Sequence, residues 1–201
     1  MNKADVKEFF DKLAPGWDDG LVKNDAIIAT ILDNADIREG VSVLDVACGT
    51  GVMIPYYLDR GVRDITAIDL SDEMIRIASE KFQGLNGADV SIKFICDDAE
   101  LADFGRKFDR IVIYNAFPHF TEPVQLLKRL AGLLNPEGTI TVAHSMSKKK
   151  LDEHHKGSAS HVSKGILSDW VLAKVFKAIG LRPYTIISND IMYQVAAVNN
   201  E

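Results

Sequence analysis

An acidic residue and the glycines that follow it carry the clearest chemical signal in this chain. Asp45 interrupts the apolar run at residues 43–47, and Gly49 and Gly51 come directly after that run. A carboxylate inside a buried strand is costly unless it has a partner, whereas glycine lets the backbone turn sharply and approach a ligand. A short strand, a Gly-x-Gly turn and a helix start together predict a nucleotide-type binding site.

The glycine turn departs from the two best-known nucleotide fingerprints. Ile54 occupies the place of the third glycine in a dinucleotide-binding Gly-x-Gly-x-x-Gly pattern. The Gly-Lys-Ser/Thr ending of a phosphate-binding loop is also missing from this turn. A nicotinamide-dependent oxidoreductase built on the same kind of sheet stays open as an alternative.

The elements that must position this turn alternate between apolar runs and helical patterns. We expect strands at residues 41–47, 65–69, 92–96, 108–114 and 139–143, helices at 4–13, 24–35, 52–59, 72–82, 122–134 and 168–178, and a turn at 135–138. Two further strands at 182–187 and 191–198 form a terminal antiparallel hairpin. The order predicts a doubly wound, mostly parallel seven-stranded α/β sheet, with its ligand over the carboxyl ends of the strands.

The motifs along these strands resemble those of one family. Asp45-x-Ala47-x-Gly49-x-Gly51 resembles the first motif of the class I S-adenosylmethionine-dependent methyltransferases. Asp69-Leu70-Ser71-x-x-Met74 and Asp98-Ala99-Glu100 are similar to later motifs of the ubiquinone/menaquinone-type branch, which methylates small molecules. Residues 10–18, 108–115 and 136–138 resemble its capping segment, its fourth motif and the turn before its fifth strand, so that the resemblance spans roughly residues 5–143.

The resemblance implies a Rossmann-like methyltransferase fold, S-adenosylmethionine as the cofactor and a small-molecule methyl acceptor. Asp45 would meet the ammonium of the cofactor's methionine end, Asp69 the ribose hydroxyls, and Asp98, rather than Asp97, the adenine amino group. The cofactor residues implied are Asp45, Ala47, Gly49, Thr50, Gly51, Asp69, Leu70, Met74, Asp98, Ala99 and Asn115. Phe10 and Trp17 would belong to a lid over cofactor and substrate.

Histidines follow the last two parallel strands. His119 and His144 are expected at the ligand-bearing edge, as candidates for a general base or for substrate contacts. His154, His155 and His161 lie in a polar segment that crosses the same edge. The spacing of these histidines matches no named metal motif, although a metal site stays open. The alternative for each histidine is a solvated or hydrogen-bonded side chain.

Length and charge limit the remaining possibilities. The 201 residues predict one domain, with an N-terminal helical lid at 1–36 and a polar His/Lys-rich cap at 144–165. The net charge of −6 argues against nucleic-acid and anionic-membrane partners, and two cysteines favour a reducing cytoplasm. We expect a monomer or homodimer; a protein that binds S-adenosylmethionine without catalysis is a further alternative.

Overall fold

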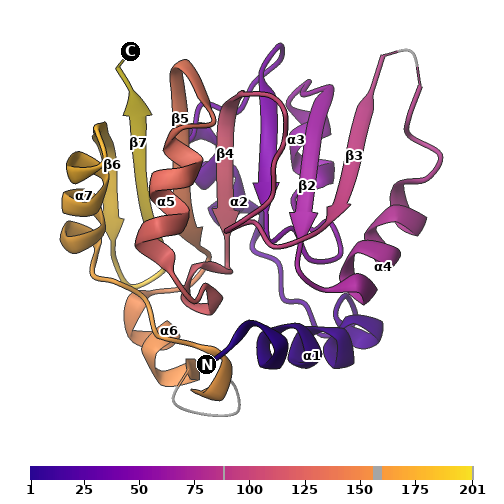
Figure 1. Cartoon of the computed structure of the whole chain (residues 1–201), viewed down its shortest axis with the longest axis horizontal. Helices are drawn as coiled ribbons and strands as arrows, with labels where there is room; N and C mark the ends of the chain where they lie inside the picture. Colours follow the sequence, from indigo (N-terminus) through magenta and orange to yellow (C-terminus); the bar gives the residue numbers. More distant parts are fainter. Residues whose placement is uncertain (88, 156–159, 201) are drawn as a thin grey trace.

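A single sheet organises the computed structural model, which describes residues 1–87, 89–155 and 160–200, without the side chains of residues 154 and 155. Its seven strands lie in the order β3-β2-β1-β4-β5-β7-β6 (Figure 1). They are β1 (Ser42–Val46), β2 (Asp64–Asp69), β3 (Ser91–Cys96), β4 (Phe108–Tyr114), β5 (Leu134–His144), β6 (Leu181–Ser188) and β7 (Tyr193–Asn199). The first five pair in parallel, and β7 pairs antiparallel with both β5 and β6. The predicted fold class is confirmed.

Helices cover both faces of the sheet and bury two separate apolar clusters. One cluster joins the strands to α2 (Asp25–Asn34), α3 (Ile54–Asp59) and the end of α4 (Asp72–Phe82). The other joins them to α5 (Pro123–Ala131) and α7 (Asp169–Ala178). Because successive strand residues face opposite sides, Leu44 and Val46 belong to the α5/α7 cluster while Val43 belongs to the α2/α3 cluster. Asp45 therefore points toward α3.

Two helices lie away from both faces, beyond the carboxyl ends of the parallel strands. In Figure 1, α1 (Lys3–Leu13) and α6 (Lys148–His155) lie below the arrowheads of these strands. The 3-10 turns η1 (Ala14–Gly16), η2 (Phe117–His119) and η3 (Ser160–Val162) complete this layer. Such a layer can close over a ligand held at the strand ends.

The N-terminal segment divides into two parts with different roles. Ile28, Ile31 and Leu32 of α2 are fully buried against the sheet, so this helix belongs to the core rather than to a lid. Residues 3–22 instead approach the carboxyl edge of the sheet. The lid predicted at 1–36 thus corresponds in position to its first part only.

The predicted start of one strand and the predicted end of one helix need correction. Strand β5 begins at Leu134 instead of residue 139, because Leu134 already pairs with Phe108 and pairing resumes between Thr139 and Arg110 after a bulge. The expected turn lies within that bulge, where Glu137 has a φ of 57°. Helix α5 ends correspondingly early, at Ala131.

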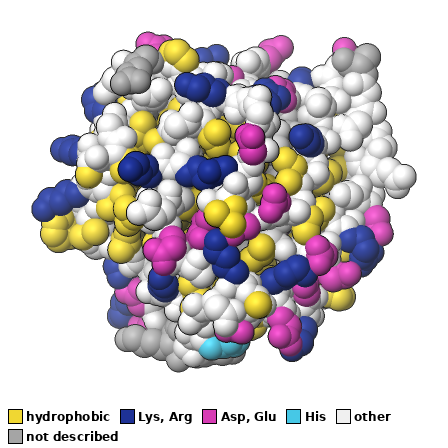
Figure 2. All heavy atoms as spheres, in the orientation of Figure 1, with side chains coloured by type: hydrophobic (Ala, Val, Ile, Leu, Met, Phe, Trp, Pro, Cys, Tyr) yellow, Lys and Arg dark blue, Asp and Glu magenta, His cyan; other side chains and the backbone are white. Residues whose placement is uncertain are grey.

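The surface and the helix lengths bear on possible partners. On the face that carries α5 and α7, acidic and basic side chains are interspersed rather than gathered by sign (Figure 2). None of the helices in the described part of the chain is both long and apolar enough to cross a membrane.

Candidate functional site

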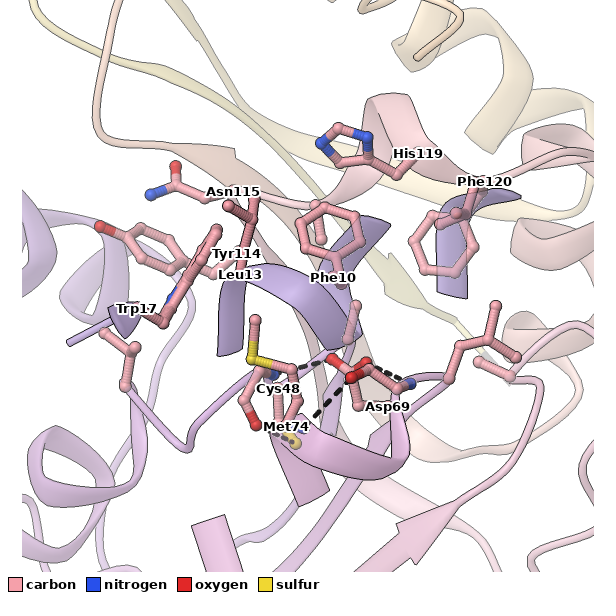
Figure 3. A pocket seen from close by; sticks show the side chains of 18 of the residues that line it. Phe10, Leu13, Trp17, Cys48, Asp69, Met74, Tyr114, Asn115, His119 and Phe120 are labelled. Atoms are coloured by element: carbon pink, nitrogen blue, oxygen red, sulfur yellow. Dashed lines mark hydrogen bonds between the residues drawn. The ribbon is translucent and has the colours of Figure 1, made fainter. Parts of the chain in front are cut away.

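A cavity of about 690 Å³ lies over the carboxyl ends of β1, β2, β4 and β5. Residues 3–22 cover it from one side, and residues from the loops after these strands and after β3 line the rest. In Figure 3, Cys48, Asp69 and Met74 gather at one end of the view and Asn115 and His119 at the other. The cavity is where a doubly wound sheet is expected to hold its ligand.

The turn after β1 is built from left-handed backbone. Ala47, Gly49 and Gly51 have φ values of 58°, 55° and 80°, a region that glycine enters freely and that costs other residues energy. Ala47 and Gly49 line the cavity. A Cβ on Gly49 would lie 3.9 Å from both Trp17 Nε1 and Met74 Sδ, so backbone conformation rather than crowding favours glycine there.

Asp69, at the end of β2, fastens this turn. Its Oδ2 accepts the Gly49 N–H at 2.8 Å and its Oδ1 accepts the Ser71 N–H at 2.9 Å. Burial nevertheless raises the pKa of Asp69, with these backbone donors acting in the opposite direction. Asp69 lines the cavity, and each carboxylate oxygen has a second lone pair for a ligand hydroxyl.

Asp45 is a buried carboxylate with one oxygen to which no described residue donates a hydrogen bond. Its side chain lines the cavity at 1 % exposure, and among the described residues Oδ2 has no hydrogen-bond partner. Burial first, and then the charge of Asp69, raise the pKa of Asp45 to about 7, while the nearby Tyr57 hydroxyl partly offsets this. An unsatisfied buried carboxylate is stabilised by a cationic donor, and the ammonium of an amino-acid-like ligand is such a donor.

Asp98, after β3, is the member of the acidic pair that faces the cavity. Asp98 lines it together with Glu100, and both carboxylates form ion pairs with Lys3 of α1. Asp97 has a local role: its Oδ1 accepts the Asp98 N–H at 2.7 Å. The expected contact of Asp98 with the adenine amino group stays a prediction.

Thr50 and Gly51, both expected to contact the cofactor, do not line the cavity. Thr50 is fully buried and donates its hydroxyl to Asp18 Oδ1 at 2.6 Å. A Cβ on Gly51 would lie 2.6 Å from Phe82 Cε2, so this glycine allows α4 to pack against the turn. Both residues support the loop from behind the cavity, and their expected contact with the cofactor stays a prediction.

The remaining expected cofactor residues lie at the cavity. Leu70, Met74, Ala99 and Asn115 all line it. Asn115 has a φ of 54° and exchanges two hydrogen bonds with Ser145: Asn115 Nδ2 donates to Ser145 Oγ at 3.2 Å, and Oδ1 accepts the Ser145 N–H at 3.0 Å. These bonds join the ends of β4 and β5.

Aromatic side chains from the lid segment meet the histidine after β4. The Phe10 ring contacts Trp17 and His119 edge-on, with centroids 5.8 Å and 5.0 Å away. His119 Nδ1 lies 2.7 Å from the Val162 carbonyl oxygen. Because a carbonyl only accepts, Nδ1 carries the hydrogen in this contact, and Nε2 is the basic nitrogen of the neutral ring.

The other histidines differ in position. His144 lines the cavity, is 1 % exposed and packs against Tyr193 with ring centroids 6.3 Å apart. The rings of His161 and Phe9 are in edge-on contact, with their centroids 5.5 Å apart. The side chains of residues 154 and 155 lie outside the described residues, within which no group of three histidine, cysteine or acidic side chains could hold a metal ion.

Sequence reasoning missed three charged residues of the lid segment. Lys3 pairs with Asp98 and Glu100 in the loop after β3. Asp11 accepts the Ser71 hydroxyl at 2.5 Å in the loop after β2. Asp18 reaches the loop after β1 through Thr50. The charges of this segment do not single these residues out, and the signal in the sequence is that Asp11 and Asp18 lie in the stretch 10–18 that resembles a capping segment.

Comparison with known proteins adds a family to this geometry. Residues 43–138 match the model of a methyltransferase domain. The chain is 28 % identical over 143 residues to a malonyl-[acyl-carrier protein] O-methyltransferase of Acetivibrio thermocellus, covering 70 % of this chain and 49 % of that relative. It is 28 % identical over 156 residues to a demethylmenaquinone methyltransferase of Paenarthrobacter aurescens, covering 71 % and 58 %. The chain thus spans about half the length of these relatives.

Solved structures agree on the fold. A chain from the complex between the Haloferax volcanii Trm112 methyltransferase activator and a methyltransferase matches with a TM-score of 0.79 at 19 % identity, covering 98 % of both chains. Magnesium protoporphyrin IX methyltransferase from Synechocystis, with bound S-adenosylhomocysteine (SAH), matches with a TM-score of 0.71 at 17 % identity, covering 98 % of this chain and 99 % of that one. Residues 43–138 thus match a methyltransferase domain, the chain is similar to malonyl-[acyl-carrier protein] and demethylmenaquinone methyltransferases, and the solved structures share its Rossmann-like fold.

Proposed function

We propose that this chain binds S-adenosylmethionine and transfers its methyl group to a small-molecule acceptor. The observation that carries the proposal is the unsatisfied carboxylate of Asp45, buried in the same cavity as Asp69. A ligand that carries an ammonium and a sulfonium suits two neighbouring buried acids. The two hydroxyls of its ribose suit the open lone pairs of Asp69.

The acidic cavity also bears on the oxidoreductase alternative. A nicotinamide dinucleotide would bring a doubly charged pyrophosphate close to the carboxylates of Asp45, Asp69 and Asp98, which line the cavity. Negative charges that are held close together repel strongly in a site of low dielectric constant. The cofactor with a net positive charge on its reactive half is therefore the better match.

S-adenosylmethionine supplies a methyl group already activated by the positive charge of its sulfur, so the chain has little bond-making chemistry to perform. Asp45, Asp69 and Asp98 orient the cofactor, and the turn at Ala47–Gly49 lets the backbone approach it. The lid segment excludes water and aligns the acceptor for in-line displacement. For an acceptor that must lose a proton, His119 Nε2 is the candidate base.

The part of the cavity that lies against the lid segment, where we place the methyl acceptor, favours an uncharged, largely apolar molecule. Phe10, Leu13, Trp17 and Phe120 line it, and His119 supplies a polar group among them. His144 is a second polar contact at the end of β5. We expect a small molecule that buries an apolar body against the lid and presents one nucleophilic atom.

Methyl transfer is tested by incubating the chain with S-adenosylmethionine and a panel of phenols, thiols, amines and carboxylic acids, with SAH release as the readout. SAH formed in proportion to a methylated acceptor supports the proposal. Cofactor binding without turnover across the panel would favour the alternative of a non-catalytic S-adenosylmethionine-binding protein.

The cellular location and the oligomeric state of the protein are also proposals. Cys48 and Cys96 are unpaired, which suits the cytoplasm, where thiols stay reduced. The net charge of −6 argues against nucleic-acid and anionic-membrane partners. We expect a monomer or a homodimer, which sedimentation of the pure protein would distinguish.

A further inference from the structure

One acidic residue joins the lid segment to the back of the cofactor turn. Asp18 Oδ1 accepts the Thr50 hydroxyl at 2.6 Å, and its Oδ2 accepts from Lys81 Nζ at 2.7 Å. The same Lys81 ammonium donates to the Thr50 carbonyl at 2.9 Å. The three residues therefore form a closed polar triangle between the lid segment, the turn after β1 and helix α4.

The triangle is well placed to hold an aromatic side chain. Trp17, adjacent to Asp18, lines the cavity, and its Nε1 lies 3.9 Å from where a Cβ on Gly49 would stand. Its ring also contacts Phe10, which in turn contacts His119. Asp18 itself does not line the cavity, so it acts on a ligand only through its neighbours.

We propose that Asp18 is a positioning residue that fastens Trp17 over the Gly49 end of the cofactor turn and so builds the wall between the cofactor and the acceptor. The inference rests on the proposed function for the identity of the ligands. The fastening itself is a property of the protein alone. Thr50 is the half of the contact that belongs to the turn, which explains its complete burial away from the cavity.

Tryptophan fluorescence gives a direct readout. The chain has two tryptophans, and Trp170 lies on α7 at 57 % exposure, away from the cavity. In a Trp170→Phe background, emission reports on Trp17 alone. We expect Asp18→Ala to shift that emission to longer wavelength, to increase its quenching by acrylamide, and to abolish the change that SAH produces.

The chain offers matched controls. Asp19→Ala removes the neighbouring exposed carboxylate and should leave the Trp17 emission unchanged. Asp18→Asn keeps an oxygen that can accept from Thr50 but loses the charge that Lys81 meets, so an intermediate effect is expected. Thr50→Val should change the Trp17 emission as Asp18→Ala does, whereas Thr50→Ser, which keeps the hydroxyl, should not. If Asp18→Ala does not fold, Thr50→Val breaks the same contact from the other side.

The pair also makes a double-mutant cycle. If both residues act through one contact, Asp18→Ala with Thr50→Val should shift the emission no further than either change alone. Additive shifts, or Asp18→Ala emission and quenching equal to those of the background, would overturn the proposal. A background protein that gives no response to SAH would count against the proposed function, whereas the comparison without ligand would still decide the role of Asp18.

Discussion

The Gly49 N–H donates to Asp69 Oδ2 at 2.8 Å. This bond links the first and second motifs, which lie at the ends of neighbouring parallel strands. The carboxylate that we assign to the ribose therefore also sets the conformation of the turn that approaches the cofactor. Asp69 is preorganised for a ligand, since its geometry is fixed by backbone donors before binding.

The first prediction concerns Ala47, which holds a φ of 58° despite its Cβ. Because that conformation costs a non-glycine residue energy that glycine avoids, Ala47→Gly should raise the free energy of unfolding by about 0.5–1 kcal/mol. Urea denaturation measures the change. Ala29→Gly, within helix α2, is the control and should lower stability by about 1 kcal/mol; loss of stability in both variants would contradict a strained Ala47.

The second prediction concerns the pH dependence of stability. Burial raises the pKa of Asp45 from 3.8 to about 7, so the folded protein keeps this carboxyl protonated where the unfolded chain ionises it. This group's contribution to stability is therefore full below about pH 4, falls as the pH rises to about 7, and is constant above. The Asp45→Asn variant lacks this titrating group. Its free energy of unfolding, compared with that of the wild type, should therefore rise as the pH increases from about 4 to about 7.

Cofactor affinity should depend on pH in the opposite sense. The ligand's ammonium requires the ionised form of Asp45, so the affinity of the wild type for SAH should increase between pH 6 and pH 8, a range that brackets the Asp45 pKa of about 7. Asp45→Asn should bind more weakly and lose this dependence. Calorimetry at several pH values checks both, and a pH-independent wild type would contradict the assigned contact.

The third prediction concerns the start of α1. Lys3 bridges Asp98 and Glu100, whose side chains are 16 % and 6 % exposed. Removing a partly exposed ion pair with Lys3→Met should speed hydrogen exchange of the α1 amides about two- to fivefold. Lys12→Met is the control, because among the described residues Lys12 pairs along the same helix, with Glu8. Equal protection in both variants would show that the lid is held without Lys3.

The fourth prediction concerns His119. If Nε2 accepts the acceptor's proton, His119→Ala should lower the rate of methyl transfer by about 10²- to 10⁴-fold and leave SAH affinity nearly unchanged. The measurement uses whichever acceptor the panel identifies. His161→Ala, which removes a ring that packs on Phe9, should keep most of the rate. A His119→Ala enzyme of normal rate would exclude this residue as the base.

Much of the fold was predictable because local signals agreed. The apolar run at Phe108–Tyr114 matched β4 in its bounds, and Ser71 caps α4 as its position before Asp72 and Glu73 suggested, accepting the Met74 N–H. The strand ends Asp45, Asp69 and Asp98 meet at one cavity because parallel strands end at the same edge.

Contacts between segments distant in sequence could not be predicted in the same way. The bonds of Asp18 to Thr50 and of His119 to Val162 join residues 32 and 43 positions apart. No periodicity encodes such pairs, since they depend on how the lid segment crosses the sheet. The bond of Thr50 to Asp18 was missed for this reason: the place of Thr50 in the motif is visible in the sequence, but the direction of its side chain is not.

The central claim is best tested by titrating S-adenosylmethionine, SAH and NAD into the wild type and Asp69→Ala by calorimetry. Because Asp69 offers charged hydrogen bonds to two ribose hydroxyls, its loss should cost about 2–4 kcal/mol, or roughly 30- to 1,000-fold in affinity. Asp64→Asn, at the other end of β2 and paired with Arg106, should bind like the wild type. We expect both S-adenosyl ligands to bind and NAD to bind far more weakly; no heat with either S-adenosyl ligand, or tighter binding of NAD, would contradict the account.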